Sequence, residues 1–119
     1  MNKKLLVLLM VTIALPAAAT QYVKPGAVLT LHPGENNAEF NINSSMGDGS
    51  GVCNMDGTAQ QIAAGESQKH RWIWNDNTSQ CVAVISELNN GKASVMTRGC
   101  EAYCGASPTG TIDGLFNKK

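Results

Sequence analysis

The sequence predicts an all-β domain, a small antiparallel barrel or sandwich of about six to eight short strands. Three observations predict it. Apolar residues alternate at a period of two along several segments. Clusters of Gly, Asn, Asp and Ser separate these segments, as turns separate strands. No segment after residue 19 repeats apolar residues over three turns at the spacing of an amphipathic helix.

The first 19 residues are predicted to be a signal peptide and are left out of the fold. The chain starts with two lysines at 3–4, continues with an apolar segment at 5–14, and reaches an A-x-A cleavage pattern at 17–19. The apolar segment is shorter than the roughly 20 residues that span a bilayer. We expect residues 20–119 to form one soluble domain in the bacterial periplasm, or in the medium after secretion, where disulfides persist.

The strands are predicted wherever alternation lies between turn residues. Asn90-Gly91 is the clearest turn and predicts a tight type I′ hairpin. Pro33-Gly34 predicts a second turn, and the glycine-rich segment 44–51 predicts a connection. The predicted strands are 27–31, 38–43, 51–55, 59–64, 70–75, 81–88, 92–98 and 111–116.

The charge pattern bears on two classes of partner. Residues 20–119 contain seven Lys or Arg and nine Asp or Glu, a net charge of −2. The sequence has no basic stripe of the kind that binds nucleic acid and no polybasic segment of the kind that binds membranes. We expect no nucleic-acid partner and no membrane insertion.

The cysteines are predicted to form disulfides. Cys53, Cys81, Cys100 and Cys104 allow three pairings. We favour Cys53 with Cys81, which joins two predicted strands across about 29 residues, and Cys100 with Cys104, which closes about five. The second bridge would fix the shape of the loop around Tyr103.

Catalytic and metal chemistry find little support. Only one pair of cysteines is closely spaced, and an oxidising compartment disfavours zinc thiolates. The C-x-x-x-C spacing also lacks the redox geometry of C-x-x-C. His32 and His70 are far apart in sequence, and no nucleophile-elbow motif is present. We expect no catalytic centre, no metal and no cofactor.

Two tryptophans stand out in the segment HRWIW. Trp72 and Trp74 alternate with Ile73, so both lie on one face of the predicted strand. Two interpretations remain open. The pair could fill the core of the barrel, or it could form an exposed aromatic platform that anchors a protein or glycan.

The C-terminal segment GCEAYCG, followed by Asp113-Gly114 and Phe116, resembles a group of small exported bacterial β proteins. These proteins carry a GCxxYCG…DG motif after two earlier cysteines and are mostly uncharacterised or lysozyme-inhibitor-like. The segment between Cys104 and Asp113 is longer than usual in that group. The Ser-Gly-x-x-Tyr motif of known periplasmic inhibitors of c-type lysozyme is not reproduced.

The expected function is binding without catalysis, by a periplasmic inhibitor of, or immunity factor against, a cell-wall hydrolase. A loop pre-shaped by a disulfide could enter an enzyme cleft at little ordering cost. The alternatives are an envelope-associated module that binds a protein or glycan through the Trp72 and Trp74 face, and a Tyr103 ring that only caps the barrel. The predicted partner-binding loop residues are Glu101, Tyr103, Ser107, Thr109 and Gly110.

Overall fold

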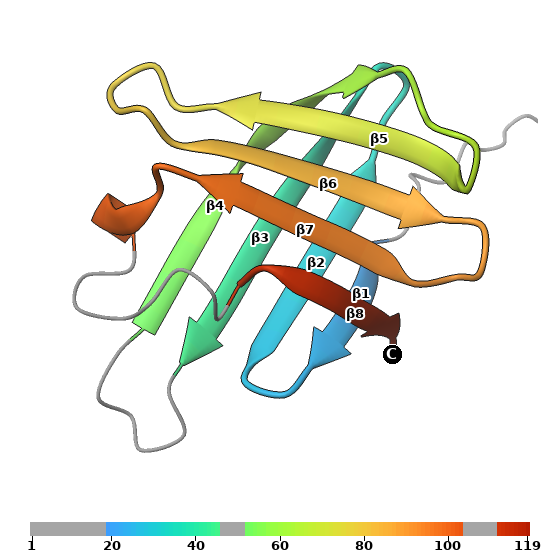
Figure 1. The fold of residues 1–119 in the computed structure, drawn as a ribbon, viewed down its shortest axis with the longest axis horizontal. Coiled ribbons are helices and arrows are strands. Elements are labelled where there is room, and N and C mark those ends of the chain that lie inside the picture. Colours follow the sequence, from blue (N-terminus) through green and yellow to red (C-terminus); the bar gives the residue numbers. More distant parts are fainter. Residues whose placement is uncertain (1–18, 46–51, 104–111) are drawn as a thin grey trace, which may run out of the picture.

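The computed structural model describes residues 19–45, 52–103 and 112–119. In these residues, eight strands form a closed antiparallel barrel in which each strand pairs with the next and β8 pairs with β1 (Figure 1). The all-β prediction and the barrel are therefore confirmed. The elements are β1 (Thr20–Lys24), β2 (Ala27–Pro33), β3 (Asn37–Ser45), β4 (Val52–Ile62), β5 (Gln68–Asn75), β6 (Val82–Leu88), β7 (Ala93–Arg98), the 3₁₀ turn η2 (Glu101–Tyr103) and β8 (Gly114–Lys118).

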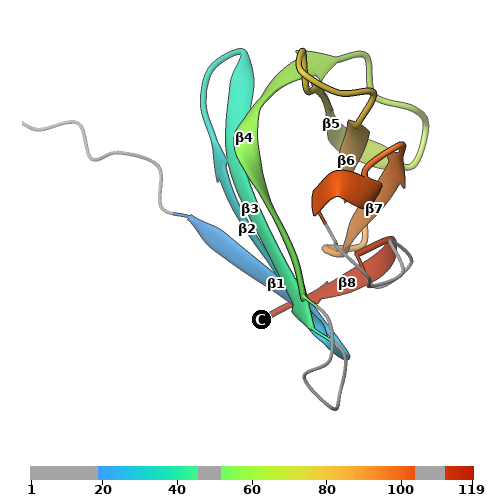
Figure 2. The ribbon, with the colours of Figure 1, turned by 90° about the vertical axis from the view of Figure 1, so that its left-hand side faces the viewer.

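The barrel has two walls that face each other (Figure 2). Strands β2 to β4 form one wall and β5 to β7 the other, with β8 and β1 closing the side between them. The two walls also meet where β4 pairs with β5, and this junction is short because the pairing involves only residues 60–62 of β4. The η2 turn lies against β4. One end of the barrel is therefore completed by η2 as well as by strand pairing.

The core fills the inside of the barrel with alternate side chains from every strand. Trp72 from β5 and Phe116 from β8 are its largest fully buried side chains. Trp74 and Tyr103 are partly buried and pack against this core. The other large core side chains include Tyr22, Leu29, Leu31, Phe40, Ile42, Met55, Ile85, Val95 and Ile112.

Two elements differ from the predicted strands. β1 was not predicted, because Tyr22 is its only buried side chain and no apolar alternation marks it. β4 was predicted as two strands but runs unbroken from Val52 to Ile62. Gly57 lies in the predicted gap between those two strands, and in the structure it makes room for an indole ring: a Cβ at this position would lie 2.5 Å from Nε1 of Trp74. Glycine inside a strand often marks such a close approach.

The hairpin at Asn90-Gly91 is present between β6 and β7, but its turn is not type I′. The amide of Gly91 donates to the carbonyl of Leu88 at 3.1 Å, and the amide of Leu88 donates to the carbonyl of Lys92 at 2.9 Å. Among these loop residues only Gly91 has a positive φ, at 89°. Type I′ needs two such residues, so the loop has three residues, a type I turn followed by a glycine bulge.

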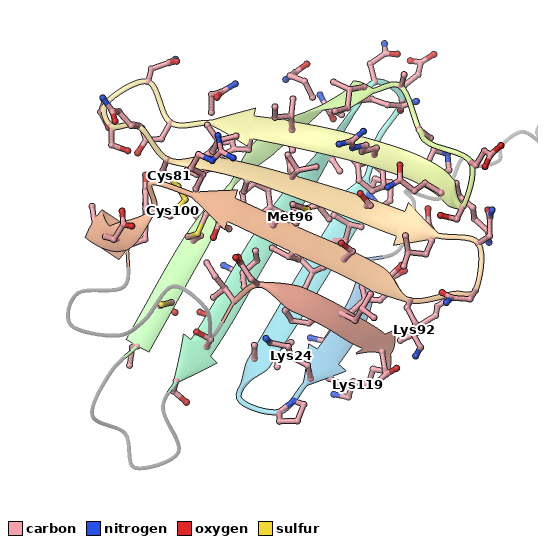
Figure 3. The ribbon with its side chains drawn as sticks, in the orientation of Figure 1. Lys24, Cys81, Lys92, Met96, Cys100 and Lys119 are labelled. Atoms are coloured by element: carbon pink, nitrogen blue, oxygen red, sulfur yellow. A yellow bond between two sulfur atoms is a disulfide. The ribbon has the colours of Figure 1, made fainter. Side chains whose placement is uncertain are left out.

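The predicted disulfide pairing is wrong. Cys81 is bonded to Cys100 beside η2, with their Cα atoms 4.3 Å apart (Figure 3). The reason is the register of β6 and β7, since Cys81 precedes the start of one strand and Cys100 follows the end of its antiparallel neighbour. Cys53 in β4 is also disulfide-bonded. Cys104 lies outside the described residues.

Candidate functional site: the barrel end around η2

The η2 turn holds Tyr103 at one end of the barrel. The Cys81–Cys100 disulfide fixes the start of the turn to the beginning of β6. The amide of Tyr103 then donates to the carbonyl of Cys100 at 3.0 Å. We call the group formed by Trp74, Asp76, Glu101 and Tyr103 the η2 rim.

Three aromatic rings connect the η2 rim to the core. Tyr103 meets Trp74 edge to face, with ring centroids 5.8 Å apart and planes at 68°. Trp74 meets Phe40 in the same manner at 5.5 Å and 74°. Edge-to-face contacts of this kind add stability beyond the area that they bury. The buried Phe40 thus supports two rings that are only partly buried.

Asp76 holds Tyr103 from the other side. Its carboxylate accepts hydrogen bonds from the Tyr103 hydroxyl, from the amide and hydroxyl of Thr78 at 2.9 and 2.7 Å, and from the hydroxyl of Ser79 at 3.0 Å. The bond from Tyr103, followed by those from Thr78, holds the pKa of Asp76 far below its usual value. The same bond to the carboxylate raises the pKa of Tyr103. Asp76 is therefore ionised and its acceptor positions are occupied, which suits a positioning role.

The turn that carries Asp76 is tied to the disulfide. The amide of Asp76 donates to the carbonyl of Cys81 at 3.0 Å, and the amide of Cys81 donates to the hydroxyl of Ser79 at 3.2 Å. The segment that carries Trp74 and Asp76 is thus joined to the η2 turn in three ways. These are the Cys81–Cys100 disulfide, the hydrogen bond from Tyr103 to Asp76, and the ring contact between Tyr103 and Trp74. Tyr103 is consequently held in one place before any partner arrives.

The structure brings together residues that belonged to separate predictions. Glu101 is exposed and Tyr103 is partly buried on η2, and the ring of Trp74 contacts Tyr103. Trp72 is only 1% exposed and belongs to the core, so for Trp72 the core interpretation is confirmed and the platform interpretation is wrong. The reason is that their shared face points into the barrel. The predicted loop residues Ser107, Thr109 and Gly110 lie outside the described residues.

Sequence reasoning missed the role of Asp76 as the partner of Tyr103. A signal was present, because an Asp followed by Thr and Ser two and three residues later commonly forms a local turn through its carboxylate. That pattern predicts the turn. It does not reveal Tyr103, which lies 27 positions away.

A second polar group lies on β5 and β6. Nδ1 of His70 is 2.7 Å from Oε1 of Glu87, and its ring stacks on Trp72 at 5.6 Å. A catalytic role would require a nucleophile beside this pair, and among the described residues no hydroxyl or thiol is hydrogen-bonded to His70. Within the same residues, no three His, Cys, Asp or Glu side chains gather as metal ligands.

No family model, curated protein or solved structure matches this chain. The described part of the chain contains no helix that is long and apolar enough to cross a membrane.

Proposed function

We propose that this chain is an exported binding protein that inhibits, or gives immunity against, a cell-wall hydrolase, and that the η2 rim is its contact surface. The observation that carries the proposal is the fixed position of Tyr103 next to the exposed Glu101. Binding costs less when the contact side chains are already ordered. Tyr and Trp are also the residues most often found as anchors in protein interfaces.

The charge around the rim indicates the chemistry of the partner. Asp76 is ionised, Glu101 is exposed, and the carboxylate of Asp56 on β4 is close enough to contribute to the raised pKa of Tyr103. An acidic aromatic surface complements a partner with basic side chains around its cleft, and such complementarity speeds association and improves specificity. The resemblance of the GCEAYCG segment to lysozyme-inhibitor-like proteins supports the same class.

An envelope-associated module that binds a glycan is the second candidate. Only Trp74 can provide an indole for a glycan to stack on, because Trp72 lies in the core. The partial exposure of Trp74 favours this candidate, and the two candidates differ in their dependence on Glu101. A glycan that stacks on an indole ring has no need of the acidic side chain.

The test is a wall-lysis assay with oxidised residues 20–119 against a panel of lysozymes and peptidoglycan amidases. We expect inhibition of one enzyme, and a loss of about 30-fold in inhibition constant for Tyr103→Ala, the size of an interface anchor. Glu101→Lys should also weaken inhibition, because it reverses an exposed charge and disturbs no packing. Glu66→Lys is the matched control, since Glu66 is exposed in the connection between β4 and β5.

Two results would count against the proposal. One is unhindered lysis by every enzyme of the panel. The other is inhibition that Glu101→Lys and Glu66→Lys weaken equally, because the effect would then depend only on net charge. Binding to soluble peptidoglycan fragments that is lost in Trp74→Ala and kept in Glu101→Lys would favour the glycan candidate.

A further inference from the structure

Charge is divided between the two walls of the barrel. Strands β2, β3 and β4 contain no Lys or Arg, and they carry the exposed acids Glu39 and Asp56. Strands β5 to β8 contain a single acid, Glu87, whose carboxylate is paired with His70. The basic residues of these four strands are Lys69, Arg71, Arg98 and Lys118, of which Lys118 shares the face of the buried Phe116 and does not lie on the outer side. The near-neutral chain therefore has one acidic and one basic side.

The outer side of β5 to β8, which we call the basic wall, also carries exposed apolar side chains. Met96 is 65% exposed and Leu115 is 56% exposed. Ile73, Val84 and Met96 are direct neighbours across β5, β6 and β7. A shallow groove of about 190 Å³ lies on this wall, lined by Val82, Val84, Met96, Thr97 and Arg98.

The apolar row lies between basic side chains. Arg98 is two positions from Met96 on β7, and Arg71 is two positions from Ile73 on β5, so each points to the same side as its apolar neighbour. Nε of Arg71 is buried and has no hydrogen-bond partner among the described residues. Figure 3 shows Met96 midway along β7, with Lys92 at the hairpin end of that strand.

We propose that the basic wall docks the barrel on an anionic lipid surface. Met96 and Leu115 enter the interfacial layer, while Arg71 and Arg98 bind lipid phosphates. Apolar side chains flanked by basic ones are the combination that binds the interface of anionic membranes. No acid on the outer side of these four strands opposes the approach, and the acidic wall faces away from the lipid.

The charges favour lipid over a second copy of the chain. Two basic walls placed face to face would repel each other. The wall formed by β2 to β4 has the opposite charge, but its outward side chains are largely polar, among them Thr30, Asn41 and Thr58. Its only strongly exposed large apolar side chain among the described residues is Val52, at the start of β4, which gives little apolar surface to match Met96 and Leu115. The docking proposal does not depend on the proposed inhibition of a hydrolase.

The test is vesicle flotation with residues 20–119. Vesicles contain either equal parts of phosphatidylglycerol and phosphatidylcholine or phosphatidylcholine alone. We expect binding to the anionic vesicles only, weakened by added salt. Arg98→Glu changes the local charge by two and should lower partitioning about 30-fold, at about fivefold per charge. Met96→Ser should lower it about tenfold through lost apolar contact.

Val52→Ser is the matched control, because Val52 is 48% exposed but lies on β4. It should bind as the unchanged protein does. Absence of binding to anionic vesicles, or binding that Arg98→Glu leaves unchanged in a variant with native circular dichroism, would overturn the proposal. So would a lipid-free dimer in sedimentation equilibrium that Met96→Ser dissociates, since the wall would then be a self-association surface.

Discussion

Replacement of Gly57 by Ala tests the link between the barrel wall and the η2 rim. The added Cβ would lie 2.5 Å from Nε1, 2.9 Å from Cε2 and 3.0 Å from Cδ1 of Trp74. Non-bonded heavy atoms prefer separations of about 3.5–4.0 Å, so the indole must move by about 1 Å. That movement disturbs the edge contacts of Trp74 with Phe40 and Tyr103.

The expected cost follows from two opposing effects. Overpacking a closely packed site costs about 1–3 kcal/mol. Alanine recovers about 0.5–1 kcal/mol, because glycine loses more backbone entropy when it is fixed in a strand. We therefore expect Gly57→Ala to lower the free energy of unfolding by about 1–2 kcal/mol. Inhibition should fall as well if Tyr103 is the contact residue, since its ring loses its support.

Urea unfolding followed by circular dichroism measures the free energy, and tryptophan emission reports the position of the indole. Gly65→Ala is the control, because its Cβ would meet only the flexible side chain of Gln68, at 3.3 Å. It should change stability by less than about 0.5 kcal/mol. If Gly57→Ala were as stable as the unchanged protein, with the same emission, the packing of Trp74 over β4 would be refuted.

Two more predictions concern the attachments of Tyr103. Replacing both Cys81 and Cys100 by Ser should lower the free energy of unfolding by about 3 kcal/mol, since the bridge closes a loop of about 20 residues; a peptide map that joins Cys53 to Cys81 would contradict the assignment. The folded-state pKa of Asp76 is lowered, so its contribution to stability is present above the usual carboxyl pKa and is lost as the pH falls below it. The difference in melting temperature between the unchanged protein and Asp76→Asn should therefore be largest at pH 7, be smaller at pH 3, and disappear only at still lower pH, because the folded-state pKa lies far below the usual value. A difference that stays constant from pH 7 to pH 3 would exclude this linkage.

Most of the fold could be predicted from the sequence, because most strands alternate apolar and polar side chains. β1 was not, since only Tyr22 is buried in it and its pairing with β8 joins distant parts of the chain. The predicted gap in β4 contains Gly57, and a glycine in a turn and a glycine beneath an indole have the same local sequence signal. The two cases differ in the indole ring of Trp74, which belongs to β5 and is not part of the local sequence around Gly57.

The candidate site could be predicted from the sequence only in part. Alternation places Trp72 and Trp74 on one face correctly, but it cannot say whether that face points into the barrel. The Cys81–Cys100 pair could have been predicted by counting outward along both strands from the Asn90-Gly91 hairpin, which brings the two cysteines to the same rim. The hydrogen bond between Tyr103 and Asp76 could not have been predicted, because it depends on how η2 packs against the folded barrel.

The closure of the barrel has a consequence for folding kinetics. Among the described strands, every pairing except one joins neighbours in sequence, and such hairpins can form early because the loops that they close are short. The exception joins β1 to β8, where the amide of Lys119 donates to the carbonyl of Gln21 at 2.9 Å. This step must bring together the two ends of the domain. A chain shortened before Gly114 would keep its hairpins but leave β1 and β7 as open edges, and its refolding would end in an incomplete sheet prone to pair with other chains.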